Sequence, residues 1–172
     1  QRRVILYDQF GCGFSSRGPV PPSPGYNLDF FMRELEVVRK YSLGLDPAQQ
    51  RFHLVGHGWG GALALNYVLA GGGGAGSVAS LTLLSTPPSL RRWMEDRRTA
   101  AGQLDERTRV ALYQGDDYPE FRASETYAAA YDAYRRRFVS AKLPGCITAA
   151  APQTSAEVER ALMGAKRFEE GG

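Results

Sequence analysis

Cysteine and histidine are scarce in this sequence, which limits the metal and disulfide chemistry that it can support. Its 172 residues include two cysteines, Cys12 and Cys146, and two histidines, His53 and His57. The cysteines lie far apart and lack the spacing of metal ligands. We therefore expect neither a zinc site nor a disulfide framework, and the sequence predicts no metal and no bound cofactor.

Long hydrophobic runs are also absent. No apolar run reaches the roughly 18 residues that a membrane-spanning helix needs, and the N-terminus lacks the apolar core of a signal peptide. These absences predict an intracellular, cytoplasmic protein without a membrane partner. The formal charge of +3 comes from separate arginine clusters, and no nucleic-acid-binding module accompanies them. We interpret the clusters as solvated helix faces and expect no nucleic-acid partner.

The hydrophobic content of 43% is that of a globular protein, and an apolar segment follows the N-terminus directly. Gln1-Arg2-Arg3 passes into the run Val4 to Tyr7 without an initiator methionine or a helix cap, so the chain is predicted to begin inside a domain. Val4 to Tyr7 is predicted to be a buried strand. A loop with two glycines, Asp8 to Gly13, follows it.

Strands and helices alternate over the next part of the chain. Leu28, Phe31 and Leu35 recur on one face of a predicted helix that has its N-cap at Asn27 and ends near Gly44. The segments predicted after it are a strand at Phe52 to Val55, a helix at Trp59 to Ala70, a flexible glycine run at Gly71 to Gly76 and a strand at Val78 to Leu84. Strands joined by helices at this spacing run parallel, so the fold class is α/β with about three parallel strands and crossover helices.

Beyond Leu90 the pattern becomes helical, polar and aromatic. Several helices are predicted between Leu90 and Val139, divided at Gly115 to Pro119, with aromatic spacing more typical of a helical core than of a binding cage. Residues Ala156 to Lys166 are predicted to form at most one frayed helix. The predicted organisation is a sheet-containing part at residues 1–89, a helical part at 90–143 and a poorly ordered tail at 144–172.

The glycine-rich turn from Gly56 to Gly61 lies between a predicted strand and a predicted helix. Its spacing matches the dinucleotide-binding pattern G-x-G-x-x-G, in which a helix N-terminus receives a pyrophosphate. That pattern needs an acidic residue about 20 positions later for the ribose, and no Asp or Glu lies between Gly56 and Met94. Trp59 would also crowd the approach of a phosphate. A dinucleotide-binding domain therefore stays as an alternative interpretation.

The same turn fits the nucleophile elbow of serine hydrolases in every position but one. In the pattern G-x-S-x-G the serine occupies a strained strand-to-helix bend, and the flanking glycines prevent clashes. The stretch Gly56-His57-Gly58-Trp59-Gly60 has glycine in place of that serine. The sequence predicts the bend of an elbow at Gly58 without a nucleophile, and glycine relieves the strain of the bend.

Longer motifs around this turn are similar to those of one family. The run from Val4 to Ser15 is similar to a strand followed by a D-Q-R-G-C-G-x-S loop, Leu54 to Gly61 is similar to G-H-S-W-G-G, and Tyr26-Asn27 and Leu83 to Pro87 also match. With these motifs, Arg2 to about Val139 resembles the proline iminopeptidases (prolyl aminopeptidases) of the α/β-hydrolase fold. The helical stretch after Leu90 then resembles the cap of that family.

The resemblance implies a serine peptidase that releases an N-terminal proline from a peptide, so such a peptide would be its partner. When the family's motif is placed on this sequence, the position of the nucleophile falls on Gly58. The backbone N–H of Trp59 then matches the family's oxyanion donor. The remaining elbow positions are Gly56, His57, Gly60 and Gly61. The candidates in the cap for receiving the substrate's free amine, by location, are Glu120, Glu125 and Asp132. Solvated helical acids are the common alternative for these three.

The resemblance also implies parts that this chain does not contain. The triad Asp and His of the family follow the nucleophile, whereas His53 and His57 both precede Gly58. The family's H-G-G-P loop would lie before residue 1. The strand that carries this loop would lie between the strands at Val4 and Phe52, so its absence would leave these two strands unpaired or force them together. We expect the chain to be inactive by itself, either as a partial form of a fuller relative or as a catalytically dead relative that binds peptides or partners.

Overall fold

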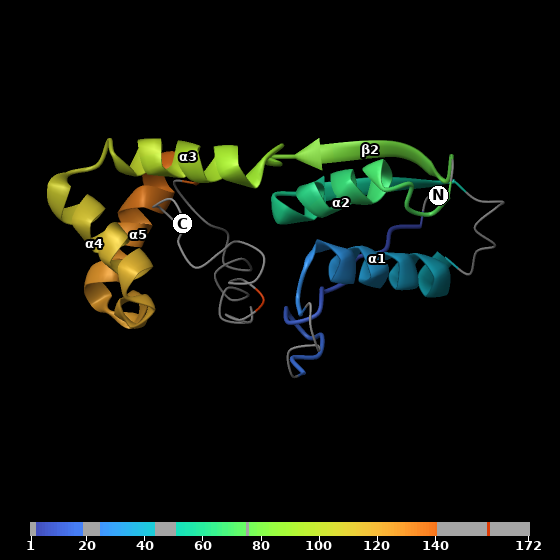
Figure 1. The fold of residues 1–172 in the computed structure, drawn as a ribbon, viewed down its shortest axis with the longest axis horizontal. Coiled ribbons are helices and arrows are strands. Elements are labelled where there is room, and N and C mark those ends of the chain that lie inside the picture. Colours follow the sequence, from blue (N-terminus) through green and yellow to red (C-terminus); the bar gives the residue numbers. More distant parts are fainter. Residues whose placement is uncertain (1–2, 19–24, 44–50, 75, 141–157, 159–172) are drawn as a thin grey trace. The chain divides into compact units, whose positions relative to one another are not determined.

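The computed structural model describes residues 3–18, 25–43, 51–74, 76–140 and 158 of the chain. These residues form two compact units, one reaching Pro88 and one beginning at Ser89, which we call the sheet unit and the helical unit (Figure 1). The tail predicted at 144–172 and the helix predicted at 156–166 lie outside the described residues, apart from Val158, which is helical. Within the described ranges, no helix is long and apolar enough to cross a membrane.

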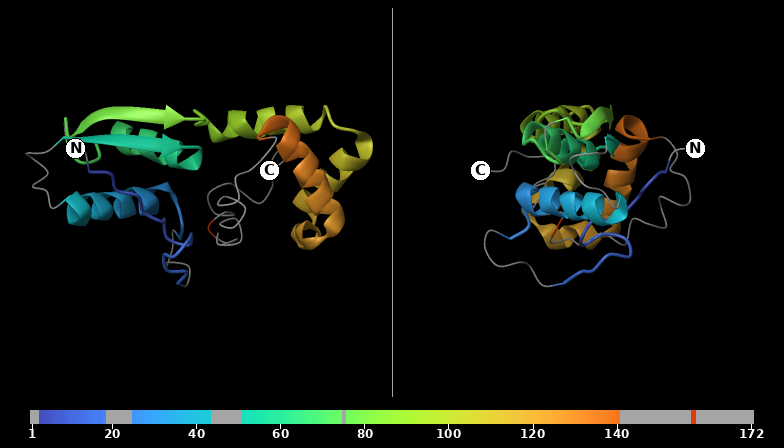
Figure 2. Two further views of the ribbon diagram at one scale, coloured as in Figure 1. Left: turned by 180° about the vertical axis from the view of Figure 1, so that it is seen from behind. Right: turned by 90° about the vertical axis from the view of Figure 1, so that its right-hand side faces the viewer.

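Two parallel strands, β1 (Phe52–His57) and β2 (Val78–Leu84), form the sheet of the sheet unit. The helix α2 (Trp59–Leu69) connects them. Figure 2 shows the two strand arrows pointing the same way, and at their ends His57 is paired with Leu84. A strand, a helix and a parallel strand in succession form the βαβ unit that the alternating pattern predicts.

Residues 4–7 do not form the predicted strand, which corrects one expectation. They belong to no strand among the described residues. Val4 and Leu6 are 78% and 90% exposed, whereas Ile5 and Tyr7 are partly buried. A strand requires backbone hydrogen bonds to a neighbouring strand, and no described strand pairs with this segment. The described sheet therefore has two strands where about three are expected.

The helix α1 (Leu28–Leu43) packs an apolar face on α2. The predicted cap is present, because Asn27 Oδ1 accepts the backbone N–H of Phe30 at 2.9 Å. On the apolar face Phe31 is fully buried and Leu35 is 8% exposed. The ring of Phe31 lies edge-on to that of Trp59, with 6.4 Å between centroids. This contact holds α1 against the residue that begins α2.

A partly buried polar network joins α1 to α2. Arg39, which is 3% exposed, donates to both carboxylate oxygens of Glu36, from Nε at 2.9 Å and from Nη2 at 2.6 Å. The hydroxyl of Tyr67 on α2 donates to Glu36 Oε2. The hydrogen bonds from Arg39, above all, lower the pKa of Glu36 to about 2 despite its partial burial. Burial and the hydrogen bond to Glu36 raise the pKa of Tyr67.

The glycine run between α2 and β2 is a hydrogen-bonded turn, so the expectation that it holds no structure is wrong for its described residues. The N–H of Gly72 donates to the carbonyl of Tyr67 at 2.8 Å. The hydroxyl of Ser77, a residue only 5% exposed, donates to the carbonyl of Gly74 at 3.0 Å. Gly71 and Gly74 have φ of 72° and 86°, a backbone conformation that glycine adopts without strain.

The helical unit contains three α-helices and one short 3-10 helix in its described part. They are α3 (Leu90–Ala101), α4 (Glu106–Asp117), η1 (Pro119–Ala123) and α5 (Glu125–Phe138). A side chain caps the start of each α-helix: Ser89, Asp105 and Ser124 accept the backbone N–H three residues later. The predicted division falls at Tyr118, between α4 and η1.

Tyrosines of α5 pack against α4 in the core of the helical unit. Tyr127 and Tyr134 are 4% and 5% exposed, and Leu112 of α4 is fully buried. The rings of Tyr127, Tyr131 and Tyr134 stack in succession, with centroids 6.0 and 6.4 Å apart. A Cβ on Gly115 would overlap the ring of Tyr127, so a glycine in α4 allows this packing. The tyrosines thus serve as core, as their spacing predicts.

Candidate active site

A single residue, Gly58, turns the chain from β1 into α2. β1 ends at His57 and α2 begins at Trp59. Gly58 has φ 56° and ψ −123°, a combination that costs a residue with a side chain about 1–3 kcal/mol. The abrupt strand-to-helix bend predicted from the glycine pattern therefore lies at Gly58.

Two further glycines allow α2 to lie close to β1 and to the segment that follows β2. A Cβ on Gly56 would lie 2.5 Å from the carbonyl oxygen of Gly60, and one on Gly61 would overlap the side chain of Thr86. By contrast, a Cβ on Gly58 or Gly60 would have no atom within 4 Å. Gly56 and Gly61 are thus required by packing, whereas a side chain at position 58 would project into open space.

Hydrogen bonds fix the bend to both neighbouring elements. The N–H of Gly58 donates to the carbonyl of Leu84 at the end of β2, at 2.9 Å. The carbonyl of Gly58 accepts the N–H groups of Gly61 and Ala62, at 3.1 and 3.3 Å. The N–H of Trp59 comes before these first helical bonds, in the turn where N–H groups have no intrahelical acceptor. It lies at the positive end of the α2 dipole and suits an oxygen that carries negative charge.

Neither histidine is placed to serve as a base at the bend. His57 is exposed at the end of β1. His53 lies five residues before Gly58, about 16 Å along an extended strand, and its Nδ1 is 2.7 Å from Ser80 Oγ on β2. This serine–histidine contact was not predicted from the sequence, because only the strand register brings the two residues together. Both are exposed, and no described hydrogen bond links His53 to a carboxylate.

The three cap acids lie at separate points of the helical unit. Glu120 in η1 and Glu125 in the first turn of α5 are exposed. Asp132 accepts hydrogen bonds from Arg135 and makes an ion pair with Arg136 at 2.6 Å. These arginines hold the pKa of Asp132 below its ordinary value, the hydrogen bonds from Arg135 contributing most. The carboxylate of Asp132 is thus already neutralised by two guanidinium groups.

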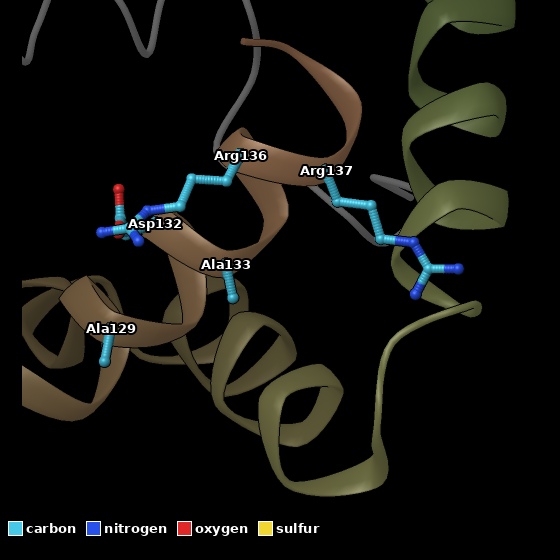
Figure 3. Close-up of a pocket in the computed structure, with 5 residues that line it drawn as sticks. All are labelled: Ala129, Asp132, Ala133, Arg136 and Arg137. Carbon is cyan, nitrogen blue, oxygen red and sulfur yellow. The ribbon is translucent and has the colours of Figure 1, made fainter. Parts of the chain in front are cut away.

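A surface pocket on α5 includes Asp132. Its lining residues are Ala129, Asp132, Ala133, Arg136 and Arg137. Figure 3 shows Arg136 reaching toward Asp132 while Arg137 extends away from it. With two arginines and one aspartate the lining carries a net positive charge, which disfavours a cationic amine in this pocket.

One buried carboxylate of the helical unit was missed by the sequence reasoning. Asp116 is 3% exposed, and its Oδ1 lies 3.4 Å from Nη2 of Arg122. Arg122 Nε also donates to the carbonyl of Gly115 at 2.6 Å. The pair ties the end of α4 to η1, which is a structural role. No sequence signal separates Asp116 from the exposed Asp117 beside it.

Comparison with known proteins identifies the family. The alpha/beta hydrolase fold family matches residues 1–159 of the chain. A proline iminopeptidase of Lactobacillus delbrueckii subsp. lactis is 34% identical over 131 residues, which are 73% of this chain and 42% of that protein. One from Heyndrickxia coagulans is 34% identical over 140 residues, 81% of this chain and 44% of its own length. The chain is an α/β-hydrolase of the proline iminopeptidase family.

A solved member of the family has the same fold. The crystal structure of a proline iminopeptidase from Mycobacterium smegmatis aligns with a TM-score of 0.71 and 28% identity, covering 96% of this chain and 54% of that one. The structure of VinJ, at 22% identity and a TM-score of 0.72, shares the fold. This member of the family spans less than half the length of the curated relatives named above.

The end of β2 lacks the acidic residue that the dinucleotide interpretation of the glycine pattern requires. In such a site the strand after the crossover helix ends in an acidic residue for the ribose. In this chain β2 ends at Leu84 and is followed by Ser85 and Thr86. The end of the strand thus offers hydroxyl groups in place of a carboxylate.

Proposed function

We propose that this chain is a non-cleaving proline iminopeptidase-like protein, which binds the carbonyl group of a peptide at the elbow without hydrolysing it. One observation carries the proposal: the strand-to-helix bend is occupied by Gly58, at φ 56° and ψ −123°. The residue at the place of the nucleophile therefore has no hydroxyl group.

Acyl transfer at this position requires a nucleophile and a base within hydrogen-bond reach of it. Gly58 cannot be the nucleophile, and His53 and His57 extend from β1 before the bend. What remains is the N–H of Trp59 at the start of α2. A backbone N–H at a helix N-terminus can hold a carbonyl oxygen in the ground state, because this needs no proton transfer.

The ligand class follows from the relatives, which are named as proline iminopeptidases. A peptide with an N-terminal proline offers a carbonyl group that the N–H of Trp59 can hold. The helical unit, taken by itself, offers carboxylates that suit a free amine. Of the three acids considered there, Glu120 and Glu125 are better suited than Asp132. The reason is that Asp132 is paired with Arg135 and Arg136.

Calorimetric titration with L-prolinamide tests the proposal. Saturable binding without release of proline is the expected result. Trp59 occupies the first position of α2, where proline is tolerated, so Trp59→Pro deletes the N–H and Trp59→Phe is the matched control that keeps it. We expect Trp59→Phe to bind and Trp59→Pro to bind at least about fivefold more weakly, the effect of one hydrogen bond. Equal affinities, or steady release of proline by the unaltered chain, would overturn the proposal.

A further inference from the structure

The last turn of α5 carries more positive charge than the neighbouring acid neutralises. Arg135, Arg136 and Arg137 all lie in that turn, and Asp132 is the acid that pairs with them among the described residues. By contrast, each of the two ion pairs on α3 joins one arginine to one acid. The end of α5 thus presents guanidinium groups whose charge is not balanced within the described part of the helical unit.

Arg137 is held in position without a carboxylate partner. Its Nη1 donates to the carbonyl of Gln103 at 3.0 Å, and its guanidinium lies over the ring of Phe138, 5.3 Å from the ring centroid. Within the described ranges Arg137 forms no ion pair. A guanidinium has five N–H donors in a rigid fork, and the bond to Gln103 uses one of them. The others are available to a ligand, and the two contacts keep the group in place for it.

Arg136 and two alanines complete the lining of the pocket. Arg136 Nη2 is paired with Asp132 Oδ2 at 2.6 Å, and its side chain is still 66% exposed. Ala129 and Ala133 lie four residues apart, so their methyl groups share one face of α5. Figure 3 shows Ala133 between the two arginines, which diverge from each other. The volume of about 460 Å³ is in the range of small-molecule sites, which leaves room for more than a single small ion.

We propose that this pocket on α5 binds a small monocarboxylate with a short apolar body. The fork of Arg137 receives the carboxylate with the help of Arg136, and the body lies on Ala129 and Ala133. A monoanion fits better than a phosphate dianion, because the cost of removing an ion from water rises with the square of its charge while the attraction rises only in proportion. The proposal concerns the helical unit alone and does not rest on peptide binding at the elbow.

Titration of the full chain by NMR, observing the arginine Nε–H signals, tests the proposal. The probes are hexanoate and N-acetyl-alanyl-alanine, and their matched controls are hexylamine and the C-terminal amide of that peptide. We expect saturable shifts of the Arg136 and Arg137 signals with the carboxylates at millimolar concentrations, and none with the controls. Response to both carboxylates, or to one alone, supports the proposal and shows whether a free acid or a peptide C-terminus fits. No saturable shift with either, equal shifts with hexylamine, or tighter binding of inorganic phosphate would overturn it.

Three variants locate the binding. Arg137→Gln should weaken the binding of the responding carboxylate at least about fivefold, the effect of one charge-assisted hydrogen bond at an exposed site. Arg107→Gln is the matched control, because it removes the same charge from an exposed residue of α4 without a described ion pair, and it should change affinity less than about twofold. Equal weakening by both would show general charge attraction and overturn the proposal.

Asp132→Asn gives an effect of the opposite sign. It removes the carboxylate that competes for Arg136, so it should strengthen binding at least about twofold, whether or not Arg137→Gln folds. A merely structural role of this ion pair would change the stability of α5 and leave the affinity unaltered. Unchanged or weaker binding by Asp132→Asn, with the helical content of the parent in circular dichroism, would refute the assignment of Arg136 to the site.

Discussion

Two carboxylates two residues apart on α1 should respond to the same substitution in opposite ways. Glu36 is held by Arg39 and Tyr67, whereas Glu34 has one unpartnered oxygen and its pKa is raised, mainly by burial. Replacing Glu36 with Gln removes the charge that Arg39 requires in its buried position. Replacing Glu34 with Gln removes a charge that burial penalises. Glu36→Gln is therefore expected to destabilise the sheet unit, and Glu34→Gln to stabilise it slightly.

The size of the Glu36 effect follows from its pKa. A fall from 4.5 to about 2 corresponds to about 3 kcal/mol in favour of the charged form, at about 1.4 kcal/mol for each tenfold change in the acidity constant. This is an upper value, because the Glu36 side chain is 27% exposed. The lowered pKa means that the contribution is present above pH of about 4.5 and is lost as the pH falls toward 2. The raised pKa of Glu34 has the opposite effect, because ionisation of this carboxyl destabilises the folded state of the parent as the pH rises. The stability of Glu34→Gln relative to the parent should therefore increase with pH.

Urea unfolding followed by tryptophan fluorescence measures both variants. The chain has two tryptophans, and in a Trp93→Phe background Trp59 reports the sheet unit alone. At pH 7, Glu36→Gln should lower the urea midpoint by up to about 1.5 M, for a slope of about 2 kcal/mol per molar. The difference from the parent should shrink on acidification to pH 3. Equal midpoints at pH 7, or a difference that does not depend on pH, would refute the reasoning.

Three further predictions concern the glycines, a helix cap and the dinucleotide alternative. Gly61→Ala places a Cβ against Thr86 and should cost about 1–3 kcal/mol of unfolding free energy, whereas Gly60→Ala, with no atom within 4 Å of its Cβ, should cost less than half as much; equal losses would contradict the packing argument. Ser124→Ala removes the acceptor for the N–H of Tyr127 and should lower the unfolding free energy of the helical unit by about 1 kcal/mol. Urea unfolding followed by Trp93 fluorescence measures this loss, and an unchanged midpoint would show that the cap does not stabilise the unit. Titration with NAD or NADP should leave tryptophan fluorescence without a saturable change, and saturation at micromolar concentrations would revive the dinucleotide interpretation.

Local signals in the sequence predicted the elements around the elbow well. Asn27 caps α1 as expected, and β2 has the predicted bounds Val78–Leu84. The bend at Gly58 was predictable because glycines two positions apart leave few other conformations for a strand that enters a helix. These features depend on residues that are close in sequence.

Features that depend on distant partners were not predictable from the sequence. Residues 4–7 have the composition of a strand, but a strand also needs a neighbour, which composition does not reveal. The bond between Glu36 and Tyr67 spans 31 residues, and the contact between His53 and Ser80 spans 27. Both depend on the packing of α1 on α2 or on the register of β1 and β2. The sequence suggested Asp132 as a carboxylate that receives the free amine of the substrate. It did not show the ion pairs with Arg135 and Arg136, which compete with an amine for this carboxylate.

Assay of the Gly58→Ser variant with proline β-naphthylamide tests the central claim most directly. A serine side chain has room at position 58, because no atom lies within 4 Å of its Cβ, so only the strain of φ 56° opposes it. The variant would have a hydroxyl group but no base in reach, and we predict that it releases no more naphthylamine than the unaltered chain does. Saturable release of naphthylamine by Gly58→Ser would contradict the claim that this elbow keeps the geometry of a hydrolase without its chemistry.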